Sequence, residues 1–104
     1  MKRISFYTLH KIDARPVEAF QHDGYTDGTY SYYRNGSRVW FAVDPATGLA
    51  VATAETRKAC AAAAHAPDRV ARFETYKAHA MYARAVDTFN ACVQDRRRKN
   101  LMGA

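Results

Sequence analysis

The chain has 104 residues, of which 48% are hydrophobic and 25% charged, and its formal net charge is +6. This length predicts a single domain over residues 1–104, and the composition excludes a wholly disordered chain. Basic and acidic residues number four and four over residues 1–29, four and two over residues 30–66, and eight and four over residues 67–104. A basic excess favours nucleic acid, an anionic membrane or an acidic protein surface as partner, although it also keeps a small protein soluble.

The sequence predicts a protein that neither enters nor crosses a membrane. No stretch approaches the roughly 20 apolar residues that a membrane-spanning helix needs. The amino terminus begins with basic residues but lacks the apolar run of a signal peptide. Cys60 and Cys92 lie far apart and show no C-x-x-C spacing, so we expect a reducing, cytoplasmic setting.

Residues 1–29 are expected to form an irregular lead-in that contributes one strand at most. Residues 3–12 alternate loosely between apolar and polar, which indicates a strand, although a helix through Leu9 also fits. Residues 15–20 favour one helical turn with Pro16 at its first position. Two Asp-Gly pairs predict a loop over residues 23–28.

Residues 30–53 predict a β-hairpin followed by a third antiparallel strand. Asn35-Gly36 is typical of a two-residue type I′ turn, which pairs Tyr33 with Arg38. On that register, one face carries the larger apolar side chains and is the expected core: Tyr30, Tyr32, Val39, Phe41, Val43, Leu49 and Val51. The opposite face carries Tyr33, Arg38 and Trp40 with smaller residues. A turn at residues 44–48 leads to the third strand at residues 49–53.

Residues 54–99 predict two helices. Thr53 is a candidate N-cap for a helix that runs through His65, and Pro67 ends it and begins the next. The second helix is expected to reach about Lys99, with an apolar arc of Met81, Tyr82, Ala85, Phe89, Cys92 and Val93. Its first half has a displaced stripe around Val70 and Phe73, which indicates a bend or contacts with two surfaces.

These elements predict an α+β fold, in which a small antiparallel sheet of three or four strands precedes two helices, the last one long. Over residues 30–65 the layout is similar to that of the amino-terminal DNA-binding arms of phage-type integrases, without a shared sequence motif.

The sequence gives no pattern that predicts an enzyme, a cofactor or a metal site. The four histidines make no H-x-x-x-H or H-E-x-x-H pair, and the glycines form no phosphate-binding loop. No serine or cysteine is brought to a histidine by its spacing. A zinc site at Cys60 and Cys92, with His65 or His79, is a minor alternative to two cysteines that pack as small apolar residues.

The face with Tyr33, Arg38 and Trp40 is the best candidate for a binding site. Nucleic-acid bases stack on such rings, and the same residue types are enriched in protein hot spots. The competing interpretation buries both rings under residues 3–20 and leaves Arg38 reaching outward. Further candidate contacts are the remaining clustered basic residues: Arg57, Lys58, Arg69, Arg72, Arg96, Arg97, Arg98 and Lys99. The run at residues 96–99 also suits the negative end of a helix dipole.

We therefore expect a small non-enzymatic binding protein that acts on a nucleic-acid-handling system. The first expectation is an inhibitor that docks on a host nucleic-acid-processing complex, similar in compactness to the anti-CRISPR proteins of phages. Direct binding of DNA or RNA is the alternative, and a module that dimerises through its long helix is a third. The protein is expected to be a monomer or a homodimer.

Overall fold

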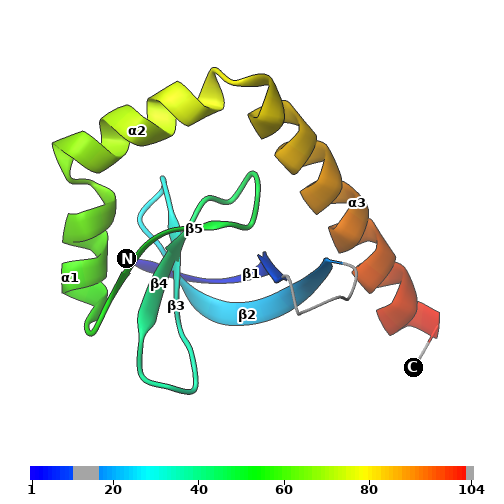
Figure 1. Ribbon diagram of the computed structural model, residues 1–104. Coiled ribbons are helices and arrows are strands. Elements are labelled where there is room, and N and C mark those ends of the chain that lie inside the picture. Colours follow the sequence, from blue (N-terminus) through cyan, green and yellow to red (C-terminus); the bar gives the residue numbers. More distant parts are fainter. Residues whose placement is uncertain (11–16, 103–104) are drawn as a thin grey trace.

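A computed structural model describes residues 1–10 and 17–102, which form a five-stranded antiparallel sheet followed by three helices (Figure 1). The strands are β1 (Lys2–His10), β2 (Glu18–Thr26), β3 (Ser31–Arg34), β4 (Trp40–Val43) and β5 (Ala50–Ala54), and they lie in chain order across the sheet. The helices are α1 (Arg57–Ala64), α2 (Pro67–Lys77) and α3 (Ala80–Met102). The fold is α+β, as predicted, but the expected sheet of three or four strands is too small.

The extra strand comes from the lead-in, where β1 and β2 pair along their full length, from Lys2 with Thr26 to His10 with Glu18. The predicted helical turn at residues 15–20 is wrong at residues 18–20, and Arg15 and Pro16 lie outside the described residues. The predicted loop is correct only from Asp27. Gly24 lies inside β2 and not in a turn. A side chain would not fit there, because a Cβ atom would stand 2.0 Å from the Tyr32 carbonyl oxygen, so the glycine permits a close contact between strands.

The β3–β4 hairpin has a five-residue connection, residues 35–39, so the predicted two-residue type I′ turn is wrong. The side-chain oxygen of Asn35 accepts hydrogen bonds from the backbone N–H groups of Ser37, at 3.0 Å, and Val39, at 3.1 Å. Arg38, and not Asn35 or Gly36, takes the positive φ, of 66°. The Asn35 side chain thus supports the connection as in an Asx-turn, together with a backbone hydrogen bond of 3.0 Å from the Asn35 N–H to the Val39 carbonyl.

This longer connection shifts the pairing by three residues, and an odd shift moves every side chain of β4 to the other face of the sheet. Tyr33 pairs with Phe41, and Tyr32 pairs with Ala42. The predicted face of Tyr33, Arg38 and Trp40 therefore does not exist, and the predicted core face mixes residues from both sides of the sheet.

All three helices pack on one face of the sheet, which Figure 1 shows as an arch around the strands. Under α1, the core consists of Tyr30, Tyr32, Ala42, Ala52, Cys60 and Ala64. Cys60 and Ala64 are four residues apart, so they share one helix face, and their small size lets α1 lie close to the strands. Ala19, Phe89 and Val93 form a second cluster that joins α3 to β1 and β2.

The predicted second helix, from about Asp68 to Lys99, is broken, because α2 ends at Lys77 and α3 begins at Ala80, but the last helix, α3, is long, as predicted. The ring Nδ1 of His79 accepts a hydrogen bond of 3.1 Å from the backbone N–H of Met81, which caps the start of α3. The break explains the displaced apolar stripes: α2 and α3 pack on different parts of the sheet. Met81, assigned to the apolar arc, is 62% exposed, so the prediction fails at that residue.

Two further expectations about helix ends can be compared with the structure. Thr56, and not Thr53, is the N-cap of α1, and its Oγ1 accepts a hydrogen bond of 3.1 Å from the N–H of Ala59. Pro67 is the first residue of α2, as predicted. Thr53 lies within β5, so the third strand extends one residue further than expected, to Ala54.

Candidate nucleic-acid interface

A groove of about 530 Å³ opens where the β3–β4 hairpin meets the start of α1. We call it the basic groove. Its lining is Arg34, Ser37, Arg38, Val39, Trp40, Glu55, Thr56 and Arg57. The lining thus holds three guanidinium groups and one indole ring, against a single carboxylate. Its volume lies within the range of roughly 300–1,000 Å³ that small-molecule sites occupy.

The local structure explains why these side chains meet. Arg34 and Trp40 are directly opposite each other on the last rung of the hairpin, so both project from the face that carries α1. Arg38 comes from the connection itself, and Arg57 is the first residue of α1. The cap at Thr56 fixes where α1 begins and hence where Arg57 stands.

Two aromatic rings contact the Arg57 side chain in the basic groove. Its Cζ atom lies 4.2 Å from the centre of the Tyr25 ring and 6.0 Å from that of Trp40. These cation–π contacts orient the guanidinium without neutralising its charge. The unpaired N–H groups in the first turn of α1 add partial positive charge at the same place. Arg34 and Arg38 are exposed, and Trp40 is half-buried against Tyr25 and α1.

The structure brings together only some of the predicted binding residues. Arg38, Trp40 and Arg57 share the basic groove with Arg34, which is not among the predicted binding residues. Arg34 lies opposite Trp40 only because the hairpin connection has five residues. The local signal for this longer connection is Asn35 itself, because an asparagine side chain can accept hydrogen bonds from the backbone N–H groups that follow it, here those of residues 37 and 39.

Tyr33 lies on the opposite face of the sheet and does not belong to the groove. Its ring stacks on His22, at 4.0 Å between centres, and on Phe41, at 5.3 Å, and the residue is 6% exposed. The predicted role for Tyr33 beside Trp40 is therefore wrong on geometry. The competing interpretation, in which residues 3–20 cover both rings, agrees with the structure for Tyr33, whose buried ring Phe6 contacts, but not for Trp40, which lies against α1 on the other face.

The basic run at the end of α3 is partly engaged in holding that helix to the sheet. Arg96 donates a hydrogen bond of 2.9 Å to the carbonyl of Ala19 and lies 3.8 Å from the Glu18 carboxylate. Lys99 pairs with Asp95 at 3.1 Å. In Figure 1, this end of α3 and helix α1 lie at opposite ends of the arch that the helices form.

The remaining predicted cations lie outside the basic groove. Arg97 has its Cζ 5.5 Å from the centre of the Tyr7 ring, and Arg98 is exposed. Lys58 is exposed on α1. Arg69 and Arg72 line a separate cavity between α2 and β5.

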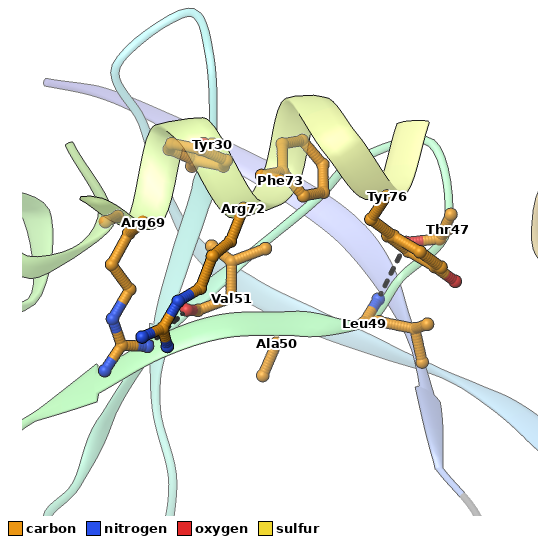
Figure 2. A pocket seen from close by; sticks show the side chains of 10 residues that line it. Tyr30, Thr47, Leu49, Ala50, Val51, Arg69, Arg72, Phe73 and Tyr76 are labelled. Carbon is orange, nitrogen blue, oxygen red and sulfur yellow. Dashed lines mark hydrogen bonds between the residues drawn. The ribbon is translucent and has the colours of Figure 1, made fainter. Parts of the chain in front are cut away.

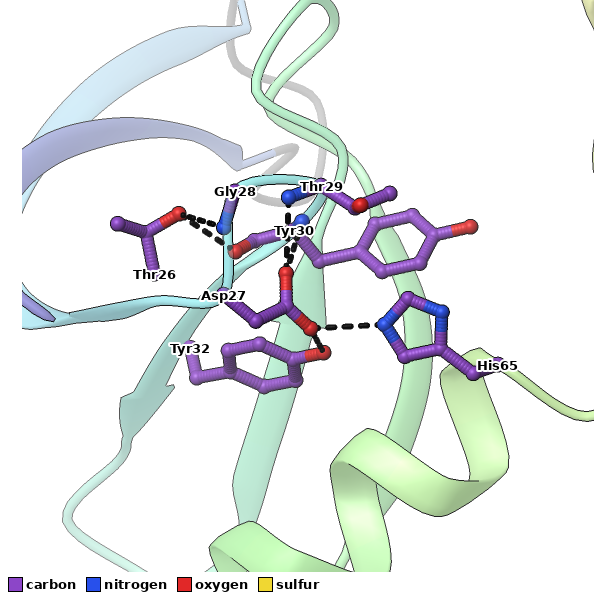
Figure 3. Close-up of polar contacts among 7 residues, drawn as sticks. All are labelled: Thr26, Asp27, Gly28, Thr29, Tyr30, Tyr32 and His65. Carbon is purple, nitrogen blue, oxygen red and sulfur yellow. Dashed lines mark hydrogen bonds and ion pairs between the residues drawn. The ribbon is translucent and has the colours of Figure 1, made fainter. Parts of the chain in front are cut away.

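Figure 3 shows a polar cluster that ties the β2–β3 connection to α1. The Asp27 carboxylate accepts hydrogen bonds from the Tyr32 hydroxyl, at 2.6 Å, and from the N–H groups of Thr29 and Tyr30, and its Oδ2 lies 2.7 Å from the His65 Nε2. Burial alone raises the pKa of Asp27, but the hydrogen bonds, with that from Tyr30 N–H first, outweigh it and hold this pKa well below 3.8. All these partners serve to anchor the turn, so we assign the cluster a structural role.

On the face opposite the helices, the buried Thr8 hydroxyl lies 2.8 Å from the Nε2 atoms of both His10 and His22. Burial, followed by the proximity of His10, lowers the pKa of His22 below 6.5. Among the described residues, no group of three or more His, Cys, Asp or Glu side chains is placed to hold a metal ion. Cys60 and Cys92 are both free thiols.

None of the helices in the described part of the chain is long and apolar enough to cross a membrane. Comparisons of the chain with protein-family models, with curated proteins and with solved structures found no match.

Proposed function

We propose that this protein is a non-enzymatic nucleic-acid-binding protein that contacts single-stranded DNA or RNA through the basic groove. The observation that carries the proposal is the convergence of Arg34, Arg38 and Arg57 beside Trp40. Guanidinium groups bind phosphates through paired N–H donors, and an indole ring provides a surface on which a base can stack. One groove thus offers both halves of a nucleotide contact.

A single strand suits this site better than a duplex. Trp40 lies on the rung nearest the hairpin connection and is half-buried, so a nucleobase must leave its own stack to reach the ring. The arginines come from the end of a strand, a short connection and the start of a helix, and none of these presents a long helix that could enter the major groove at this site. Two free cysteines suit the reducing cytoplasm, where we place this activity.

The test is the affinity for a fluorescently labelled oligonucleotide, single-stranded or duplex, measured by anisotropy with Arg34→Gln and Arg38→Gly variants. Glycine accepts the positive φ of residue 38, so Arg38→Gly removes the charge without straining the connection. We expect each variant to weaken single-strand binding about fivefold, the effect of about 1 kcal/mol for one exposed ionic contact.

Arg84→Gln is the matched control, because Arg84 is exposed on α3 and lies outside the basic groove. It removes one positive charge from the protein, as the groove variants do. Equal losses in all three variants would mean that net charge alone attracts the strand, which contradicts a site at the groove.

Absence of any nucleic-acid binding by the folded protein would overturn the proposal in favour of a protein target. Tryptophan and arginine are also the residues that dominate protein hot spots. In that case the expectation of an inhibitor that docks on a nucleic-acid-processing complex becomes the account to test. The same groove variants would then be examined for loss of that complex.

A further inference from the structure

A second cavity, of about 290 Å³, lies between α2 and the edge strand β5 (Figure 2). Figure 2 shows Phe73 and Tyr76 reaching from α2 toward the strand, where Val51 points back at them. Tyr30 adds a third aromatic ring, which meets Phe73 edge-on with 6.1 Å between ring centres. We call this space the aromatic cavity. It shares no lining residue with the basic groove.

Two guanidinium groups stand at one end of the aromatic cavity. Arg69 and Arg72 are three residues apart on α2, so both project from the same side of the helix, and Figure 2 shows their heads close together near β5. Arg69 is held there by a hydrogen bond of 2.9 Å from its Nη1 to the carbonyl of Val51. Neighbouring like charges destabilise a helix, so the repulsion between Arg69 and Arg72 is a cost to the free energy of folding.

The charge at this end is not balanced within the cavity. None of the described residues that line it is acidic. Of the two acidic residues on α2, Glu74 pairs with Lys77 at 3.4 Å, and Asp68, next to Arg69 in the sequence, does not line the cavity. The cavity thus combines apolar and aromatic walls with a localised positive end, which is the complement of a molecule with a flat apolar body and a negative head.

We propose that the aromatic cavity binds a small aromatic carboxylate. The carboxylate would lie against Arg69 and Arg72, where planar guanidinium groups match its geometry. The ring would lie between Val51 on β5 and the side chains of Phe73 and Tyr76 on α2. A volume of about 290 Å³ lies just below the range of roughly 300–1,000 Å³ for small-molecule sites, which favours a ligand of one or two rings.

The experiment is a titration of the ¹⁵N-labelled protein with 2-naphthoate, followed by amide chemical shifts. Its neutral partner is 2-naphthalenemethanol, which has the same ring system without the charge. We expect naphthoate to shift the amide signals of Val51, Phe73 and Tyr76 and to bind about tenfold more tightly than the alcohol, as one charged hydrogen-bonded contact provides.

Two variants show whether the arginine end is responsible. Arg72 is exposed, so Arg72→Gln is expected to leave the fold intact, to lower naphthoate affinity about tenfold and to leave the affinity for the alcohol unchanged. Arg84→Gln, outside the cavity, is expected to change neither. Equal affinities for the acid and the alcohol, or shifts that spare these amides, would overturn the proposal.

Discussion

At the residue scale, a few polar side chains hold connections that the strands and helices alone would leave loose. Asp27 is the clearest case, because its carboxylate joins the β2–β3 connection, the core residue Tyr32 and the end of α1. Burial and the hydrogen bond to Asp27 raise the pKa of Tyr32 well above its ordinary value of 10.0, so the hydroxyl stays a donor. The network depends on the charge of one carboxylate.

We predict that Asp27→Asn destabilises the protein by about 2 kcal/mol at neutral pH, because hydrogen bonds to a charged acceptor are lost. The Asp27 pKa is below 3.8 in the folded protein, so its contribution is present above that pH and declines as the pH falls further. Urea unfolding of both proteins at pH 7 and at pH 3 measures this, and the gap should narrow at pH 3. A gap that does not depend on pH would contradict the ionic explanation.

The lowered pKa of His22 leads us to predict a loss of stability in a pH range above that of Asp27. Its pKa is below 6.5 in the folded protein, so below pH 6.5 the unfolded chain binds the proton first. Stability should therefore fall as the pH drops from 6.5 toward the folded pKa. Urea unfolding between pH 8 and pH 5 tests this, with His22→Gln as the comparison. A variant as pH-dependent as the wild type in this range would show that another group titrates.

At the element scale, the sequence predicts the elements from residue 30 to the first helix well and their pairing poorly. The strands at residues 30–53 and the helix that ends near His65 lie close to their expected positions. The hairpin register fails because Asn35 bonds through its side chain, which lengthens the connection and exchanges the faces of β4. The sequence does not indicate strand β2, because Gln21, His22 and Asp23 form a continuous polar run without apolar alternation and Gly24 resembles a turn residue.

The β4–β5 connection lies against β1 and α3, and its close packing there requires a glycine at residue 48. This residue has a φ of 67°, and a Cβ atom there would lie 2.4 Å from the Phe89 ring. Its carbonyl also accepts a hydrogen bond of 2.9 Å from the N–H of Leu9 on β1. Three elements thus meet at a position that has no room for a side chain.

We predict that Gly48→Ala lowers the free energy of unfolding by about 3 kcal/mol, since it adds a steric overlap to backbone strain. Gly28→Ala is the matched control: its φ is 92°, but no atom lies within 4 Å of the added Cβ. That variant should lose only the backbone part, about 1 kcal/mol. Denaturant unfolding of both measures the difference, and equal losses would mean that contact with Phe89 is unimportant.

At the scale of the whole molecule, the sequence predicts a basic α+β protein, and it does not show where the charges gather. Residues far apart along the chain, such as Arg34 and Arg57, meet only through the hairpin register and the cap of α1. Conversely, in the dense run of basic residues at 96–99, Arg96 serves to attach α3 to the sheet. Spacing along a helix can be inferred from one sequence, but a site assembled from a strand, a connection and a helix depends on pairing.

The central claim is that a nucleic-acid strand binds beside Trp40, and the fluorescence of this one tryptophan reports it directly. We would titrate the protein with a single-stranded oligonucleotide at about 50 and about 200 mM salt. Stacking should quench the emission, and three phosphate contacts predict a logarithmic salt slope of about −2, or about 15-fold weaker binding at the higher salt. Unchanged Trp40 emission at either salt, in protein shown to be folded, would contradict the account.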